Sequence, residues 1–390
     1  MYTVSRANSS AKRARITVVP IGEGHHTALA EFFRVAWGGD ASADTVAFAR
    51  GETARANPVD RGSPPPAYVA VQEERIIGYC GSIPVRFWDG RSERGSYWAK
   101  GLMVLPEFRN GPIGFLVLQE LSRSLAVSAA VTVHLASKRL FKALGYADKG
   151  ALMNYVRPVA AGRMLQRIPV ELGGLPAWVQ RVLRLAQRSG LAFLVGASGG
   201  VGLRLMSVVG GMGGGFDIEL DAAPSSADLD RLWLSLRRTI LAGVVRDATA
   251  LLPRYGDGAA GANYRYAAVR SGSELVGLAI VRRPRAQGDP RLRGIRVATV
   301  SELIFPADRG AIGAAALLGA ERVARSMGAD AILCTACHPA AISALRRQLY
   351  LPIAGNVHFF LQDKTASASW PQALSDWWLT RGDGESDATF

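Results

Sequence analysis

The feature that most limits how this chain can fold is an internal repeat. The stretch that begins at Tyr68 has the same rhythm of apolar, glycine and proline residues as the stretch that begins at Tyr266. The matched positions, about 200 residues apart throughout, are Gly78 and Gly277, Pro106 and Pro306, and Gly114 and Gly313. Such self-similarity predicts two copies of one domain, and 390 residues suffice for two domains with separate cores.

Each copy has a pattern of alternating strands and helices. A short strand, a longer strand, a polar hairpin turn and a third strand ending at proline lead into a glycine-containing loop and an apolar helix. A β-branched run follows from Val131 in the first copy and from Ala331 in the second, and a further helix comes after it. Opening helices are expected at 27–37 and 227–239, the second with Ser225 or Ser226 as N-cap. We therefore predict an α/β fold with mixed sheets, built as tandem duplicated domains packed pseudo-symmetrically.

The repeat divides the chain into five parts. We expect a basic tail at 1–14, an N-terminal domain at 15–157, a linker at 158–215, a C-terminal domain at 216–364 and a tail at 365–390. The linker contains the amphipathic basic sequence AWVQRVLRLAQR, followed by a glycine-rich apolar run shorter than the ~20 residues that cross a bilayer. Two interpretations stay open: helices packed between the domains, or contact of 177–212 with the inner face of a membrane.

Composition narrows the classes of partner. With 49% hydrophobic and 20% charged residues, the chain has the composition of a folded globular protein. The net charge of +14 comes almost entirely from arginine in an alanine- and glycine-rich sequence, and no nucleic-acid motif accompanies it, so we expect no nucleic-acid partner. Three cysteines form no disulfide framework, and the first residues do not resemble a secretion signal, which favours a cytoplasmic protein.

The loop after the third strand of the first copy is a predicted anion site. It consists of Arg109, Asn110, Gly111, Pro112, Ile113 and Gly114 and leads into an apolar helix. The free backbone N–H groups of a helix start point at a ligand there, and glycine allows a phosphate to come close. Pro112 suits the first turn of a helix, and the planar guanidinium of Arg109 matches phosphate oxygens.

This order of motifs resembles the GNAT superfamily of N-acetyltransferases. The quoted elements are the strand ending in VLP, the loop RNGPIG at a helix start, the following strand, and the helix ending in KRLFKALGY. Pro112 departs from the family pattern, which has a glycine there. In the second copy Asp308 stands where arginine or glutamine is usual, Ala311 replaces the same glycine, and Gly313 is retained. An acidic side chain would repel a pyrophosphate, so we place the cofactor in the first copy.

The resemblance implies a cofactor, a reaction and a set of residues. The cofactor is acetyl-CoA or another acyl-CoA, with its pyrophosphate at 109–114 and its thioester carbonyl on the backbone of Leu102, Met103 and Val104. An amine attacks the thioester directly in a ternary complex, giving an N-acyltransferase. Phe141 stands where the family often has a tyrosine that protonates the leaving thiolate, and phenylalanine cannot do so. Trp98 and Lys100 on the same strand are further candidates for substrate contact.

The acceptor amine must lose a proton, and two residues are candidates for the base. His134 follows the β-branched run of the first copy, and Glu302 lies within the third strand of the second copy. A carboxylate inside a strand is costly unless it is paired, which makes Glu302 a site candidate. A structural, hydrogen-bonded histidine is the competing interpretation of His134.

The acceptor is suggested only by likeness. The stretch from Arg246, RDATALLPRYGDG, and the terminal SDWWLTRGDGESD resemble parts of tandem GNAT proteins found with bacterial polysaccharide genes. The acceptor expected from this is a small molecule or a sugar precursor of the cell envelope.

Two other functions stay open. Degenerate repeats can form a non-catalytic module that binds CoA or another ligand. The string Cys334-Thr335-Ala336-Cys337-His338 matches the c-type haem attachment pattern, which coincidence explains better because it falls on a predicted strand. A zinc site from Cys80 with this string lacks ligand spacing, so no metal is predicted, and the sequence does not fix the oligomeric state.

Overall fold

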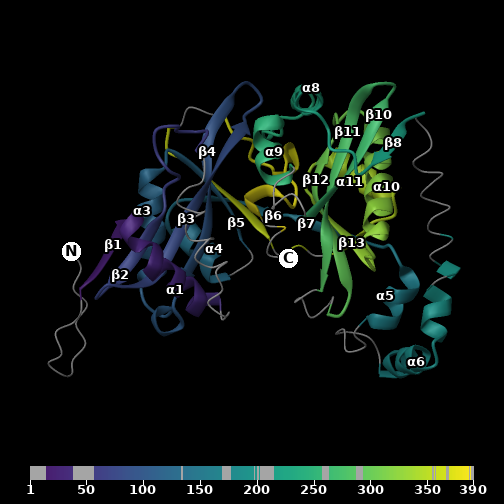
Figure 1. Ribbon diagram of the computed structural model, residues 1–390, viewed down its shortest axis with the longest axis horizontal. Coiled ribbons are helices and arrows are strands. Elements are labelled where there is room, and N and C mark those ends of the chain that lie inside the picture. The colour runs from purple at the N-terminus through teal and green to yellow at the C-terminus, as the bar shows by residue number, and fades with distance from the viewer. Residues whose placement is uncertain are drawn as a thin grey trace.

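The computed structural model describes residues 15–37, 57–132, 135–168, 177–196, 198–199, 202, 215–256, 263–286, 293–353, 355, 357–365, 369–385 and 387. Figure 1 shows two twisted sheets next to each other, with helices packed on them and α8 and α9 above the gap between them. This is the mixed α/β duplication that the repeat predicted.

The elements of the first copy lie, apart from its last strand, in the left-hand body in Figure 1. They are β1 (Ile16–Pro20), α1 (His26–Trp37), β2 (Tyr68–Gln72), β3 (Arg75–Trp88), β4 (Glu93–Val104), α3 (Ile113–Ser124), β5 (Val127–Thr132), α4 (Leu135–Ala143), β6 (Ala147–Ala151) and β7 (Met153–Pro158), with short 3₁₀ turns η1 (Glu23–His25) and η2 (Pro106–Phe108). Two helices, α5 (Ala161–Arg167) and α6 (Ala177–Arg188), lead towards the second copy.

The second copy repeats this order and ends in a structured tail. Its elements are β8 (Asp217–Leu220), α8 (Ser226–Arg237), β9 (Ala242–Val244), α9 (Ala248–Tyr255), β10 (Tyr264–Ser271), β11 (Glu274–Ala286), β12 (Arg296–Ile304), α10 (Gly310–Ser326), β13 (Ala331–Ala336), α11 (Pro339–Arg347), β14 (Leu351–Ile353), β15 (His358–Asp363), η5 (Leu374–Asp376), β16 (Trp377–Trp378) and η6 (Asp383–Glu385). The expected cap of α8 is confirmed, because the Ser225 side chain accepts a hydrogen bond from the Asp228 N–H.

The two sheets exchange a strand. The first has the order β1-β2-β3-β4-β5-β15-β6 and the second β14-β7-β13-β12-β11-β10-β8. Strand β15, from the end of the second copy, is thus inserted between β5 and β6, and β7, from the end of the first copy, lies between β13 and β14. Boundaries near 157 and 364 divide the chain by sequence copy and not by sheet, because local alternation marks a strand without naming its neighbours.

Matched glycines let one helix of each copy approach its sheet closely. A Cβ added to Gly78 would lie 2.6 Å from Cγ2 of Ile113 on α3, and one added to Gly277 would lie 2.5 Å from Cγ2 of Ile312 on α10. Any side chain at these positions would push the helix away from the sheet. The glycine pair that revealed the repeat therefore has the same packing role in both copies.

Each sheet opens in the middle, between two parallel strands. β4 and β5 pair only through Tyr97 with Ser128 and Trp98 with Ala129. β12 and β13 pair from Val297 to Val300 and then separate. Each opening contains or adjoins a bulge: near Gly101, whose φ is +67°, in β4, and near Ser301 in β12. Beyond Trp98, β4 has no pairing with β5 among the described residues.

The expected C-terminal tail is part of the core. Trp377 and Trp378 are buried, and β16 extends the first sheet through β9, which itself pairs with β3. Trp377 packs edge-on against Phe87 and Phe359, so the tail joins aromatic residues of both copies. Truncating a buried tryptophan costs about 3–5 kcal/mol, so this segment contributes substantially to stability.

The strand exchange predicts that the halves stay joined after the chain is cut. A protease site inserted between residues 203 and 214 is expected to yield two fragments that elute together, because each holds a central strand of the other's sheet. Size-exclusion chromatography, with a denaturing gel to verify the cut, measures this. Fragments that elute separately without denaturant would contradict the exchanged topology.

Candidate functional site

The predicted anion loop is exposed from Arg109 to Pro112 and leads into α3, whose first residues, Ile113 and Gly114, are buried. The first helical hydrogen bond runs from the Leu116 N–H to the Pro112 carbonyl, so the N–H groups of Ile113, Gly114 and Phe115 precede it and have no partner within the helix. Together with the positive end of the helix dipole they form a site for an anion. Arg109 lies at the same end, and its Nε donates to the Val104 carbonyl at 3.1 Å.

The opening of the first sheet lies beside this loop. Leu102, Met103 and Val104 follow the bulge of β4, on the stretch with no strand neighbour on the β5 side within the described residues. A Cβ on Gly114 would come no closer than 3.5 Å to Leu140 or Val104, which is ordinary contact. The strand and loop positions expected to hold a cofactor are therefore adjacent and uncrowded.

The equivalent opening of the second sheet is filled by the protein itself. A Cβ on Gly313, the counterpart of Gly114, would lie 2.4 Å from the Phe305 ring. Trp378 packs edge-on against that ring with centroids 5.1 Å apart, and its Nε1 donates to the Leu303 carbonyl at 3.0 Å. The Gly382 N–H donates to the Ser301 carbonyl at 2.7 Å. The C-terminal segment thus lies along β12 and takes its free carbonyl groups.

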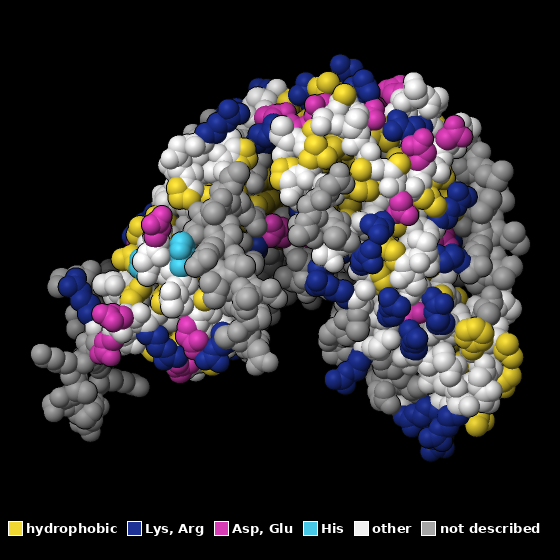
Figure 2. Space-filling model, viewed as in Figure 1, with side chains coloured by type: hydrophobic (Ala, Val, Ile, Leu, Met, Phe, Trp, Pro, Cys, Tyr) yellow, Lys and Arg dark blue, Asp and Glu magenta, His cyan; other side chains and the backbone are white. Residues whose placement is uncertain are grey.

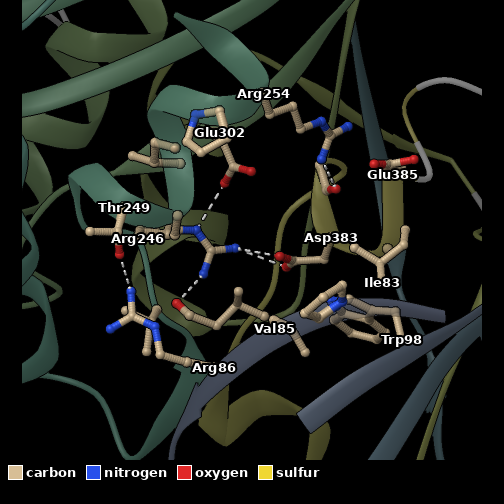
Figure 3. A pocket seen from close by; sticks show the side chains of 18 of the residues that line it. Ile83, Val85, Arg86, Trp98, Arg246, Thr249, Arg254, Glu302, Asp383 and Glu385 are labelled. Carbon is tan, nitrogen blue, oxygen red and sulfur yellow. Dashed lines mark hydrogen bonds and ion pairs between the residues drawn. The ribbon is translucent and has the colours of Figure 1, made fainter. Parts of the chain in front are cut away.

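A cavity of about 470 Å³ lies between the halves. Its first wall comes from β3 and β4, its second from β9 and α9, and its floor from β12 and the C-terminal segment; Figure 3 shows these side chains from close by. The lining residues that carry charge are Arg86, Arg246, Arg254, Glu302, Asp383 and Glu385. Ile83, Val85, Trp98, Leu251 and Pro253 are among the apolar ones.

A buried arginine organises the floor. The Nε of Arg246 donates to Glu302 at 2.8 Å, and its Nη2 donates to Asp383 at 2.8 Å and to the Thr380 hydroxyl at 2.9 Å. Nη1 donates to the Val244 carbonyl at 2.7 Å and lies 3.4 Å from the Trp378 carbonyl. Every N–H of this guanidinium is directed at a protein oxygen, so the cluster is fixed in one geometry.

The two carboxylates of this cluster have different surroundings. Glu302 accepts from Arg246, from the Tyr255 hydroxyl at 2.9 Å and from the Thr380 hydroxyl at 2.8 Å. Asp383 accepts from Arg246 and from the Thr380 N–H at 2.7 Å. Burial raises the pKa of Asp383 to about 6, helped by Glu302 and opposed by Arg246.

Other charges around the cavity are paired. Arg86 joins the halves by bonding Glu93 of β4 and Asp247 at the start of α9, each at 2.7 Å. Arg254 stacks on Tyr255 and pairs with Asp387, which also accepts from the hydroxyls of Tyr264 and Ser301. These ion pairs cross from one copy to the other or to the tail, and they fix the cavity walls relative to each other.

Of the two candidate bases, Glu302 lies within the described residues and His134 does not. Glu302 lines the cavity floor on β12, and its side chain is 5% exposed. His134 lies outside the described residues, in the short break between β5 and α4. Lys100 pairs with Glu385, and Trp98 lines the cavity.

Phe141 belongs to the core of the first half. It stacks on Phe360 of the inserted β15, with ring centroids 5.5 Å apart, and meets Tyr146 edge-on at 5.0 Å. Its ring is buried away from the cavity lining, so a packing role accounts for it.

The haem-like string has a structural role in the described chain. Cys334 is buried within β13, the Cys337 thiol lies 3.1 Å from the Trp377 carbonyl, and burial raises the pKa of each thiol to about 12. The His338 ring accepts the Ala340 N–H and caps α11. Attachment to haem requires accessible thiols, which this packing denies. No group of three or more potential metal ligands occurs among the described residues.

Sequence reasoning missed most of the cavity. Arg246, Tyr255 and Asp383 have no local sequence signal of their own, because charged residues beside glycines are typical of solvent-exposed segments. The composition of the C-terminal segment does indicate burial. Its two adjacent tryptophans, WW, are typical of a core, and the charged residues of the nearby RGDGE could form ion pairs.

Comparisons with known proteins place the fold. No protein-family model matches the chain, and no curated protein sequence matches it. Solved structures do match, with low sequence identity. A GCN5-related N-acetyltransferase from Anabaena variabilis ATCC 29413 superposes with a TM-score of 0.55 at 11% identity, over 90% of this chain and 73% of that one.

Two further structures give the same result. A GCN5-related N-acetyltransferase from Kribbella flavida has a TM-score of 0.54 at 14% identity, over 90% of this chain and 72% of that one. A conserved protein from Enterococcus faecalis V583 has a TM-score of 0.55 at 10% identity, with coverages of 90% and 73%. The chain therefore has the fold of the GCN5-related N-acetyltransferases.

Proposed function

We propose that this protein is an acyl-CoA-dependent N-acyltransferase whose single donor site lies in the first half. The observation that carries the proposal is the difference between the two openings. The first leads to an uncrowded helix start with Arg109 beside it, whereas Phe305 and Trp378 fill the second. A fold shared with N-acetyltransferases supports the reaction class.

In this proposal the pyrophosphate of the acyl-CoA binds the N–H groups at the start of α3 and the guanidinium of Arg109. The pantetheine arm lies along the free edge of β4, from Val104 back to Leu102, and brings the thioester to the bulge near Gly101. Backbone N–H groups there stabilise the oxyanion that develops when an amine attacks the carbonyl.

The acceptor amine enters from the cavity between the halves. Trp98 is the last β4 residue paired with β5 and also lines the cavity, so it connects donor and acceptor sites. Acceptors with a primary amine fit this arrangement, amino-sugar precursors of the cell envelope among them, and a cytoplasmic location suits the supply of acyl-CoA. Glu302 lies at the cavity floor and belongs to the Arg246 cluster. Its carboxylate oxygens already accept hydrogen bonds from Arg246, Tyr255 and Thr380.

Loss of the Arg109 charge is expected to weaken CoA binding. Arg109→Ala removes a charge-assisted contact of about 1.5–3 kcal/mol, which corresponds to a roughly 10- to 100-fold rise in Kd measured by calorimetry. Arg309→Ala, at the exposed start of α10, is the matched control and is expected to leave the affinity unchanged. An effect of the control and none of Arg109→Ala would move the donor site to the second half.

The filled second opening predicts one CoA per chain. Isothermal titration with acetyl-CoA is expected to give a stoichiometry near one, because Trp378 and Phe305 occupy the second slot. A stoichiometry near two would refute this account of the second half. No binding and no thermal stabilisation by acetyl-CoA would refute the acyltransferase proposal and favour a module that binds another ligand.

We further propose that α6 contacts an anionic membrane. Trp178, Val182 and Leu185 are each at least 60% exposed on one stripe of the helix, beside a stripe formed by Arg181, Arg184 and Arg188. Figure 2 shows Lys and Arg side chains next to hydrophobic ones at the lower right, where Figure 1 places α6. The Gln187 amide anchors the other side by donating to Leu165 and Ile168 carbonyls. Among the described helices none is long and apolar enough to span a bilayer.

Vesicle sedimentation tests this contact. Wild-type protein is expected to bind vesicles containing phosphatidylserine. The double variant with Trp178→Ser and Leu185→Ser is expected to bind about tenfold more weakly. Each side chain would contribute roughly 1.5–3 kcal/mol if it were fully buried, and partial insertion into the membrane reduces that contribution. Leu241→Ser, at another highly exposed leucine, is the control. Equal binding by both variants, or equal binding to neutral vesicles, would contradict the proposal.

A further inference from the structure

The C-terminal segment reaches the opening of the first half as well as that of the second. A Cβ on Gly384 would lie 2.6 Å from Cγ2 of Val131 on β5 and 3.6 Å from the Trp98 ring on β4. Glu385 pairs with Lys100 of β4. The turn at 383–385 therefore lies where β4 and β5 begin to separate, and Figure 3 shows Asp383 between Arg246 and Trp98.

The cluster on which this turn rests carries an excess negative charge. One guanidinium, that of Arg246, is shared between the carboxylates of Glu302 and Asp383, and all three side chains are at most 5% exposed. With both carboxylates ionised the cluster has a net charge of −1. A buried unbalanced charge is costly, so the cluster favours the uptake of a proton or the approach of a cation from the cavity.

The cluster offers the cavity an acceptor of protons and no donor for an anion. The N–H groups of Arg246 are all directed at protein oxygens, so none is available to a carboxylate or phosphate of a substrate. Of the two carboxylates, Glu302 receives two hydroxyl donors as well as the guanidinium, so its oxygens already face protein donors. Asp383 is the carboxylate whose pKa burial raises, to about 6.

The rest of the cavity wall is mainly apolar. Ile83, Val85 and Trp98 face the cluster from β3 and β4, and Leu251 and Pro253 face it from α9. A ligand that places a cation on the floor must bury an uncharged body against these side chains.

We propose that Asp383 is the base that takes the proton from the acceptor, and that the acceptor is a primary ammonium on an apolar or aromatic body. The inference rests on the proposed acyl transfer and names the acceptor class and the proton acceptor of that same site. Desolvation in an apolar cavity lowers the pKa of an ammonium, which is ordinarily about 10, and raises that of the carboxylate, so the two approach each other.

The proposed transfer forms a C–N bond and breaks a C–S bond. Asp383 removes one proton from R–NH₃⁺, and the nitrogen lone pair attacks the thioester carbon to form the C–N bond. The C–S bond then breaks, and the thiolate of CoA takes a second proton from the nitrogen. The products are the amide and free CoA thiol, and the proton on Asp383 passes to solvent. No tyrosine at position 141 is required for this sequence.

Ionisation of Asp383 sets the expected pH dependence. The groups that face it are Arg246 and Glu302, with the Cys337 thiol behind the tail. The Arg254–Asp387 and Lys100–Glu385 pairs flank it, and Arg381 is two residues away in the chain. Because the base acts as a carboxylate, kcat/KM is expected to rise as pH increases through about 6.

The test uses the full-length protein, acetyl-CoA and phenethylamine, with release of CoA thiol as the readout. Wild type is expected to acetylate the amine and to be stabilised by it in thermal unfolding, but not by 2-phenylethanol, which has the same body without the charge. Asp383→Asn is expected to lower kcat/KM by about 10²- to 10⁴-fold and to abolish the inflection near pH 6, and Asp383→Glu to restore part of the rate.

Two measurements distinguish a catalytic role from a structural ion pair. Asp383→Asn is expected to keep the wild-type affinity for CoA and to unfold at pH 8 no lower in temperature than wild type, since it removes a buried excess charge. Glu385→Gln, on the same turn, is the matched carboxylate variant and is expected to retain the inflection.

Several outcomes would overturn the inference. They are equal stabilisation by amine and alcohol, no stabilisation by either, an inflection that persists in Asp383→Asn, and one that disappears in Glu385→Gln instead. Each of these, with acetyl-CoA still bound, refutes the role of Asp383 and leaves the acyltransferase proposal intact. Failure of acetyl-CoA to bind refutes both.

Discussion

The structure depends on a reciprocal exchange of strands. Without β15 the first sheet would have an unfilled gap between β5 and β6, and without β7 the second would have one between β13 and β14. A strand in the middle of a sheet satisfies backbone hydrogen bonds on both edges, so neither copy can bury its own sheet completely. The two copies are therefore one folding unit. The cavity between them has walls that cannot move apart without breaking these ladders, which suits the proposed alignment of two substrates.

Duplication allowed the two openings to take different roles. In the first, the loop at 109–112 before the helix is exposed, and in the second the aromatic pair Phe305 and Trp378 closes the equivalent space. Filling an apolar slot with two rings gains burial energy that a binding site must forgo, so the second opening stabilises the fold, whereas we propose that the first binds a ligand. The tail that fills one opening also forms the floor of the cavity beside the other. The C-terminal segment thus stabilises the second half and also lines the cavity beside the opening of the first.

Local patterns in the sequence predicted the local structure well. The glycine pair Gly78 and Gly277, the loop before α3 and the Ser225 cap depend on steric and hydrogen-bonding rules that act within a few residues. The partners of β7 and β15 depend on contacts about 200 residues away, and alternation in MNYVRP or HFFLQD is the same whichever sheet receives the strand. Arg246 escaped notice for a related reason: its burial is made possible by Asp383, 137 residues later.

The tail has a consequence for biosynthesis. Translation proceeds from the N-terminus, so the first sheet waits for β15 and the cavity floor waits for Asp383. Until the ribosome has released β15, the first copy is an incomplete sheet with an unpaired edge, which is prone to aggregate. A truncated product that stops before Trp377 would lose both a buried aromatic segment and the carboxylate of Asp383.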